Sequence, residues 1–238
     1  MSQTSDIFHK KSKELAADRA HREVINFNIG KYNAAVPGGK KQYINLDLAR
    51  ERAKNIKWKA IETLDQQLEN FEYHITQRGA KVIWCENAQQ AAAAVVAICK
   101  EKNCKTLVKS KSMVTEEIHL NQHLEENGIE SVETDLGEYI QQLAGEPPYH
   151  IVTPAMHKSK EDIARLFAEK LGTDPTLNPQ QLTLVAREKL RQKYAEAEVG
   201  VTGANFIIAD MGGVAVTENE GNARLSCSMP KTHIVIAG

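Results

Sequence analysis

The sequence predicts an α/β protein with a mostly parallel, mixed sheet and flanking helices, preceded by an N-terminal helical extension. From about residue 80, short apolar stretches alternate with stretches of helical character, an order that implies right-handed crossovers and parallel strands. After residue 204 the apolar stretches are separated by short connections, which indicate antiparallel hairpins. Strand signals are scarce before residue 79. We therefore expect a helical extension over residues 1–78 and an α/β domain over residues 79–238.

The extension is expected to hold two main helical stretches. The first covers residues 5–33, and the Pro-Gly-Gly run at residues 37–39 is expected to break it from the second. The second stretch has apolar residues at three- and four-residue spacing, which places them on one face of a helix. These residues are Ile61, Leu64, Leu68, Phe71 and Ile75.

The α/β domain is expected to begin with four strands. Their residues are 81–85, 106–110, 129–133 and 150–153. Helices are expected between and after them, over residues 88–102, 114–127, 136–143 and 159–171. Gly128 and Gly172 close two of these helices, since glycine readily adopts the left-handed conformation of a helix end.

A longer helix over residues 179–198 leads into the last part of the chain. Four further strands are expected there, over residues 205–210, 213–217, 224–228 and 233–238. The last of these is apolar and ends at Gly238. We expect a chain with this ending to be the amino-terminal part of a longer protein, and the alternative is a natural end in a single-domain protein.

Composition and charge exclude several classes of function. Lys and Arg together number 30 and Asp and Glu 31, a net charge of −1, so nothing favours nucleic acid or an anionic membrane surface. The first twenty residues lack the apolar core of a secretory signal. The longest apolar run, residues 91–99, is far short of the roughly 20 residues of a membrane span. The four cysteines fit neither a disulfide framework nor a paired metal-binding spacing. We expect a cytoplasmic protein.

Ligands of open parallel sheets bind at the carboxyl ends of strands, and two loops there carry a first set of candidates. Lys109, Ser110 and Ser112 follow one strand and could hold an anionic group. The alternative is that a serine caps the next helix and the lysines are solvated. Glu133, Thr134 and Asp135 follow the next strand. Asp135 with Glu138 also fits a capping box, so Glu133 is the stronger functional candidate of this loop.

Two further loops complete the candidate site. His150 and His157 flank a loop after the fourth strand and could act as acid, base or ligand, or could simply be satisfied by hydrogen bonds. The loop over residues 217–224 crowds polar groups around Gly221, and the preceding strand ends in Asp210, which could face the same cleft. The candidates of this loop are Asn219, Glu220, Asn222 and Arg224. A single Glu-x-x-His segment at residues 116–119 lacks the second copy that a carboxylate-bridged metal site requires, so no metal is predicted.

Several long segments, in this order, resemble one known family. They are KSKSMVTEEIHLN, GIESVETDLGEYIQQL, PPYHIVTPAMHKSKEDI, NFIIAD and ENEGNARL, followed by PKTHIVIAG. Together they are similar to the LUD domain of lactate utilisation protein B. The resemblance implies the fold of ribose-5-phosphate isomerase, glucosamine-6-phosphate deaminase and CoA transferases. It also implies a component of an iron–sulfur system that oxidises L-lactate to pyruvate, with the other subunits of that complex as partners.

This chain departs from the family in one respect. The resemblance implies that a ferredoxin-like domain with [4Fe–4S] clusters follows the LUD region, but the C-x₂-C-x₂-C-x₃-C-P spacing of cluster ligands is absent here. We therefore expect no cofactor in this chain and [4Fe–4S] clusters in a missing carboxyl-terminal domain.

Residue chemistry gives a hypothesis for catalysis and leaves rival functions open. CoA transferases of the implied fold use a glutamate in a Glu-Asn-Gly loop, but Glu220 stands in place of that glycine, so their mechanism does not carry over. Instead Glu220 or Glu218 could be a general base while Arg224 holds a carboxylate, with Glu133 and His150 as further catalytic candidates. The alternatives are a stand-alone enzyme acting on a phosphosugar or acyl-CoA, and a non-catalytic assembly module.

Overall fold

The computed structural model describes residues 3–149, 153–218 and 220–238. The chain forms two compact units. The helical unit comprises residues 1–51 and 140–182, and the sheet unit comprises residues 52–139 and 183–238. The predicted boundary between a helical extension and an α/β domain at residue 78 is a different kind of division, because it concerns domains that fold independently. It stays a prediction. Among the described helices, none combines the length and the apolar character that crossing a membrane requires.

The helical unit begins with α1 (Gln3–Ala17) and α2 (Arg19–Lys40). The chain breaks between them because an Asp18 side-chain oxygen accepts the main-chain N–H of His21 at 3.0 Å, the usual way in which an aspartate begins a helix. The prediction of one helix over residues 5–33 is therefore wrong at Asp18. The predicted break at Pro-Gly-Gly is also misplaced, since α2 includes Pro37 and ends at Lys40.

Helix α9 (Lys160–Leu171) confirms the helix expected over residues 159–171. The Ser159 hydroxyl accepts the main-chain N–H of Asp162 at 3.1 Å, and the Asp162 carboxylate accepts the main-chain N–H of Ser159 at 2.9 Å. Gly172 closes the helix at φ +70°. Phe167 is fully buried and anchors this helix in the helical unit.

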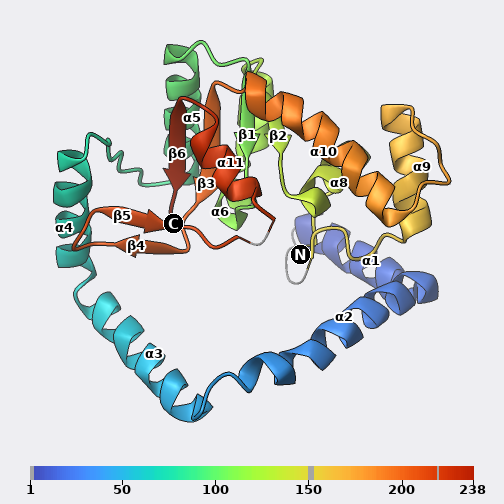
Figure 1. Cartoon of the computed structure of the whole chain (residues 1–238), viewed down its shortest axis with the longest axis horizontal. Coiled ribbons are helices and arrows are strands. Elements are labelled where there is room, and N and C mark those ends of the chain that lie inside the picture. The colour runs from blue at the N-terminus through green and yellow to red at the C-terminus, as the bar shows by residue number, and fades with distance from the viewer. Residues whose placement is uncertain (1–2, 150–152, 219) are drawn as a thin grey trace. The chain divides into compact units, whose positions relative to one another are not determined.

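The sheet unit contains four parallel strands in the order β2-β1-β3-β6 (Figure 1). Their bounds are β1 Thr106–Lys109, β2 Glu130–Glu133, β3 Val199–Gly203 and β6 Thr232–Ile236. A separate antiparallel pair is formed by β4 (Phe206–Ile208) and β5 (Gly213–Ala215). The predicted α/β class with mostly parallel strands is thus confirmed. Because the four parallel strands point the same way, all their carboxyl ends meet at one edge.

The remaining helices connect these strands. They are α3 (Leu46–Glu62), α4 (Leu64–Gln77), α5 (Ala88–Glu101), α6 (Met113–Glu117), α7 (Leu120–Glu126), α8 (Leu136–Ala144), α10 (Pro179–Glu196) and α11 (Asn222–Ser228). The apolar face predicted from Ile61 onward is interrupted, because α3 ends before Thr63 and Ile61 is exposed. Phe71 of α4 is buried as expected.

Helices α5 and α7 form the main apolar core against one face of the sheet. The core joins residues of α5 to Leu107 of β1, to Leu120 and Leu124 of α7, and to Val199 and Val201 of β3. The contributions of α5 are Ala92, Val95, Val96 and Cys99, all buried. Burial of this apolar surface is the main driving force that holds the sheet unit together.

Helix α11 lies against the opposite face, at a place where the sheet has no side chain. A Cβ atom on Gly200 of β3 would lie 1.9 Å from the main-chain oxygen of Ser226, so only glycine permits this approach. The strand predicted over residues 224–228 is wrong, since these residues belong to α11. The Glu218 carboxylate accepts the main-chain N–H of Arg224 at 2.9 Å, which satisfies one of the free N–H groups at the start of that helix.

Three other expectations differ from the structure. Residues 81–85 form no strand, and Ile83 and Trp84 are exposed. Strand β3 was not predicted, because its sequence VGVTG contains two glycines and lacks a strong strand signal. The single helix expected over residues 114–127 is broken at His119, which has φ +51°. The strand expected over residues 150–153 lies largely outside the described residues.

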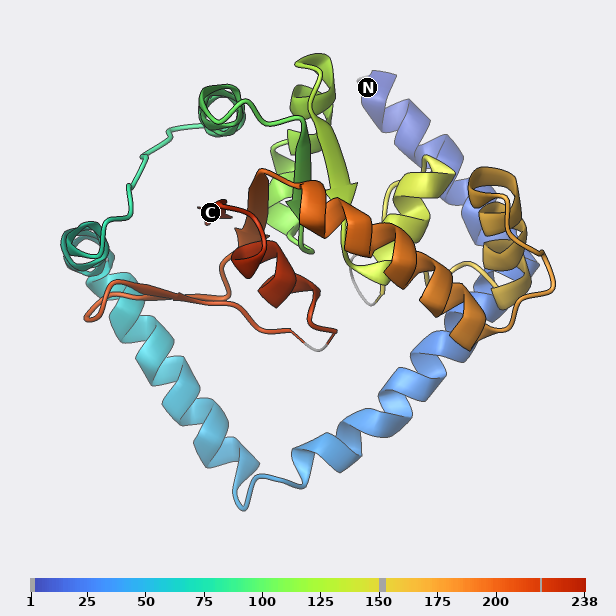
Figure 2. The same cartoon turned by 45° about the horizontal axis from the view of Figure 1, so that its top comes forward.

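The β4–β5 hairpin lies beside α4, as both views show (Figure 1 and Figure 2). The Arg78 Nε donates to the main-chain oxygen of Met211 at 2.8 Å. A Cβ atom on Gly212 would lie 2.3 Å from the main-chain nitrogen of Ile75. The predicted hairpin is therefore confirmed, with its turn packed on the helix.

We predict that Gly200→Ala destabilises the sheet unit by at least about 2 kcal/mol, because α11 must move away from the sheet to admit the methyl group. Gly213→Ala is the matched control, since its Cβ would make only ordinary contacts of 3.7 Å or more. Urea unfolding followed by circular dichroism measures both. Equal midpoints for the two variants would contradict the close approach of α11.

Candidate functional site

Two charged residues at the carboxyl ends of neighbouring strands form the centre of the site. Lys109 of β1 and Glu133 of β2 occupy paired positions in the parallel register, so their side chains leave the same face of the sheet. The Lys109 Nζ lies 2.8 Å from a Glu133 carboxylate oxygen, and the two side chains are 0% and 4% exposed. The structure thus brings together two of the predicted residues as a buried ion pair.

Helices α6 and α7 supply the other partners of this pair. The Lys109 Nζ also lies 3.0 Å from Glu116 and donates to the Thr115 hydroxyl at 2.9 Å. The Asn121 amide donates to Glu133 at 2.8 Å and accepts from the Ser131 hydroxyl at 2.9 Å. The break at His119 separates α6 from α7, so that α6 delivers Thr115 and Glu116 to Lys109 and α7 delivers Asn121 to Glu133.

The charges around Lys109 are unequal in number. Burial alone would lower the pKa of Lys109, but the carboxylates of Glu133 and Glu116 outweigh it and raise that pKa above its ordinary value. Burial and the nearby Glu133 carboxylate raise the pKa of Glu138 on α8 to about 9. Lys109 therefore lies among three glutamate side chains, and the one on α8 has a strongly raised pKa.

The opposite face of the same sheet edge carries hydroxyl groups. The Thr134 hydroxyl donates to the main-chain oxygen of Lys109 at 2.9 Å and lies 3.4 Å from the Ser226 hydroxyl. Ser110 is 2% exposed, and its hydroxyl has no hydrogen-bond partner among the described residues. Ser112 is buried at the start of α6 without capping it through its side chain, so the capping alternative is not observed for this serine.

The loop after β5 approaches the other two loops through Glu220. Partial burial of the Glu220 carboxyl group and the nearby charge of Asp135 raise its pKa, while a hydrogen bond from the main-chain N–H of Leu136 and the nearby Lys111 oppose that rise. The residue as a whole is exposed, as is Lys111. Glu220 therefore lies close enough to Asp135 and Lys111 for their charges to affect its pKa.

Glu218 and Arg224 of the same loop form an ion pair with each other. Arg224 Nε and Nη2 lie 3.0 and 2.9 Å from one Glu218 oxygen. The main-chain N–H and guanidinium of Arg224 lower the pKa of Glu218, against a small opposing effect of burial. The pKa of Glu218 is therefore lowered, and the Arg224 side chain, which is 78% exposed, is paired with that carboxylate in this structure.

Asp135 performs half of the predicted capping box. One of its carboxylate oxygens accepts the main-chain N–H of Glu138 at 3.1 Å, which helps to begin α8. The Glu138 carboxyl group is buried beside Glu133. Glu138, which its spacing from Asp135 predicts to be part of a capping box, thus belongs to the charged cluster.

The other predicted residues belong to the helical unit, have other surroundings in the sheet unit, or lie outside the described residues. His157 belongs to the helical unit, where it stacks on Tyr149 at 4.1 Å and lies 3.0 Å from Glu146. Asp210 is exposed in the turn of the β4–β5 hairpin. The main-chain oxygen of Asn222 accepts from the Tyr194 hydroxyl at 3.3 Å. His150 and Asn219 lie outside the described residues.

Sequence reasoning missed Glu116 and Asn121 as members of the cluster. Both fall in a stretch that reads as one exposed amphipathic helix, and its interruption at His119 has no glycine or proline to signal it. The only available hint was that a lysine ends an otherwise apolar strand, since a buried lysine requires a carboxylate partner.

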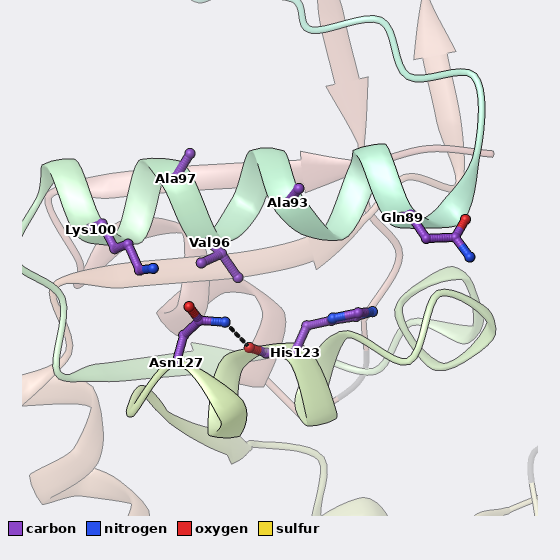
Figure 3. Close-up of a pocket in the computed structure, with 7 residues that line it drawn as sticks. All are labelled: Gln89, Ala93, Val96, Ala97, Lys100, His123 and Asn127. Carbon is purple, nitrogen blue, oxygen red and sulfur yellow. Dashed lines mark hydrogen bonds between the residues drawn. The ribbon is translucent and has the colours of Figure 1, made fainter.

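A separate groove lies between α5 and α7 (Figure 3). Its volume is about 360 Å³, and its floor is apolar with polar groups at the rim. The Asn127 amide at that rim donates to the main-chain oxygen of His123 at 2.8 Å. The lining residues are Gln89, Ala93, Val96, Ala97, Lys100, His123 and Asn127. None of the residues predicted to act lines this groove.

The cysteines of this chain do not fit an iron–sulfur cluster. Cys85 is exposed, Cys99 and Cys104 are buried, and Cys227 is half-buried 3.5 Å from the His233 imidazole. Over the described ranges, no three His, Cys, Asp or Glu side chains are grouped so that they could hold a metal ion. These cysteines are therefore given no role in binding a cluster.

Comparison with known proteins gives a consistent result. The family model described as "LUD domain" matches residues 68–238. Lactate utilization protein B of Bacillus velezensis is 47% identical over 190 residues, and that of Bacillus subtilis (strain 168) is 46% identical over 190 residues. The "Uncharacterized electron transport protein YkgF" of Escherichia coli (strain K12) is 42% identical over 189 residues. Each comparison covers 79% of this chain and 40% of the relative. This chain thus spans about two fifths of the length of these relatives. No solved structure matches it.

We predict that Lys109→Met lowers the free energy of unfolding by about 3–5 kcal/mol, because two buried or half-buried carboxylates lose their counter-charge. Lys111→Met, at the exposed neighbouring lysine, should change it by less than about 0.5 kcal/mol. Denaturant unfolding of both variants tests the prediction. A Lys109→Met protein as stable as the Lys111→Met protein would show that the ion pair is not central.

The raised pKa of Glu138 predicts a pH dependence of stability. A carboxyl group whose pKa is raised on folding contributes stability below its unfolded pKa of about 4.5, and that stability is lost as pH rises toward about 9. We expect Glu138→Gln to remove this pH-dependent loss, which amounts to up to a few kcal/mol of the free energy of unfolding. Unfolding measured between pH 5 and 9 checks it, with Glu117→Gln on exposed α6 surface as control. If the free energy of unfolding of Glu138→Gln fell with pH as steeply as that of the parent, Glu138 would not be the group responsible.

Proposed function

This chain belongs to the LUD domain family, and from that premise we propose that it takes part in lactate utilisation. The observation that carries the proposal is the identity of 45–47% over about 190 residues to proteins named Lactate utilization protein B from several bacilli. Identity at this level over four fifths of the chain supports a shared role as well as a shared fold.

In finer terms, we propose that the chain is part of a cytoplasmic protein that oxidises L-lactate to pyruvate together with other subunits. That oxidation releases two electrons and two protons. Electron transport in the name of the Escherichia coli relative supports this class of reaction. Because the cysteines here do not fit a cluster, we assign any [4Fe–4S] clusters to protein outside these 238 residues.

The contribution of this chain is proposed to be the binding of a small anionic ligand at the carboxyl edge of the sheet. Lys109 is fully buried and already paired with Glu133 and Glu116, so its role in this proposal is to hold the elements of the sheet edge together. Lys111, two residues later, is exposed and close enough to Glu220 to affect its pKa. Lys111 is therefore the lysine of this loop that can reach the carboxylate of a ligand.

Glu220 is the proposed proton acceptor. Its pKa is raised by burial and by Asp135, and a carboxylate with a raised pKa is a better base near neutral pH. Glu218 is tied to Arg224, which lowers its pKa. We therefore favour Glu220 over Glu218 as the group that would accept the hydroxyl proton of the ligand. The second proton and the two electrons would pass to an acceptor outside these 238 residues.

We predict separate kinetic effects for these two residues in the intact protein assayed with its partner subunits. Glu220→Gln should lower kcat for lactate-dependent reduction of an artificial acceptor by about 10²-fold or more, since proton transfer is lost. Lys111→Gln should mainly raise KM. Glu188→Gln, on the exposed surface of α10, is the control. Unchanged kcat in Glu220→Gln would exclude it as the base.

The assignment of clusters outside this chain predicts two properties of the intact protein isolated from its source. Its mass should be well above that of 238 residues, and it should show the visible absorbance of iron–sulfur clusters. Intact mass spectrometry and an absorption spectrum test both. A colourless protein with the mass of this chain would favour a stand-alone domain instead.

A further inference from the structure

The neighbourhood of α4 carries an unusual amount of exposed apolar surface. Two elements are held to this helix. The Trp84 Nε1 donates to Glu72 at 3.1 Å, and Arg78 binds the main-chain oxygen of Met211. We call the exposed apolar side chains of these three elements the α4 face. They are Leu64, Tyr73, Ile83, Trp84, Phe206 and Met211, each at least half exposed.

Residues 81–85 form the most distinctive part of the α4 face. Their sequence, KVIWC, consists largely of residues that favour strands, yet they form no strand. Within the described ranges, no main-chain N–H of these five residues donates a hydrogen bond. They are held before Lys81 by the main-chain N–H of Ala80, which donates to the main-chain oxygen of Ile75 at 3.3 Å, and toward their other end by Trp84 and by α5, which begins at Ala88.

A fixed, apolar, strand-forming segment with unpaired main-chain groups is a template for a further strand. Main-chain groups of this kind are normally paired in native proteins unless water satisfies them. Ile83 and Trp84 are more than half exposed, at 53% and 57%, and side chains of this size are buried in most folded proteins. Both observations indicate that residues 81–85 are covered in the functional assembly.

The length of the related proteins indicates what covers residues 81–85. This chain matches 40% of each relative, so about three fifths of those proteins lies outside the matched part. We propose that the α4 face is an intramolecular docking surface. A region of the same polypeptide outside these 238 residues adds a β-strand to residues 81–85 and packs apolar side chains over Trp84 and Phe206. The inference concerns assembly and does not depend on which ligand the site binds.

Amide hydrogen exchange tests this proposal. The 238-residue chain and the intact protein isolated from its source are compared at residues 81–85, with the core helix α5 as internal reference. We expect exchange at residues 81–85 to be at least about tenfold slower in the intact protein and α5 to exchange alike in both. Equal exchange at residues 81–85, or an intact protein no longer than this chain, would overturn the proposal.

A matched pair of variants separates docking from a general effect on folding. Ile83→Asp places a charge within the α4 face, and Ile56→Asp places one at an exposed position of α3. In the intact protein, Ile83→Asp should return residues 81–85 to the fast exchange of the short chain, and Ile56→Asp should not. Retained protection in Ile83→Asp would overturn the proposal. So would slow exchange in the 238-residue chain that rises with concentration alongside a dimer mass by light scattering, since a second copy would then be the occupant.

Discussion

The buried ion pair between Lys109 and Glu133 is the interaction on which the site depends. A lysine cannot be buried without partners, since an unpaired charge in a protein interior costs several kcal/mol. The parallel register places Glu133 beside it, and Glu116 and Asn121 complete the arrangement from α6 and α7. The left-handed turn at His119 is needed because a continuous helix would not direct both of these side chains inward.

This ion pair determines which groups remain for chemistry. Because Lys109 is enclosed, the described residues that are exposed at this edge and available to the proposed ligand belong to the loops above it. Lys111 and Glu220 lie there, close to Asp135 and to the start of α8. Below them, burial and the Glu133 carboxylate raise the pKa of Glu138 to about 9. In the proposed function the buried residues support the loops, and the exposed residues would contact the ligand.

Patterns of apolar residues were enough to predict the α/β class and most helices. The failures have physical causes. Residues 224–228 alternate like a strand, but the Glu218 carboxylate begins a helix there. Strand β3 was hidden by its glycines, one of which lets α11 approach the sheet. The role of Lys109 could not be read from its loop, because its burial depends on three carboxyl groups supplied by separate elements.

In the proposed site, Lys109 supports the fold and Lys111, two residues later, contacts the ligand. Nuclear magnetic resonance of the side-chain ammonium groups during titration with L-lactate tests it directly. The buried Lys109 signal should be slow to exchange with water and unchanged by the ligand, and the Lys111 signal should shift with saturation. A shift of Lys109 without any change at Lys111 would contradict the account, because the ligand would then contact the group assigned to the support of the fold.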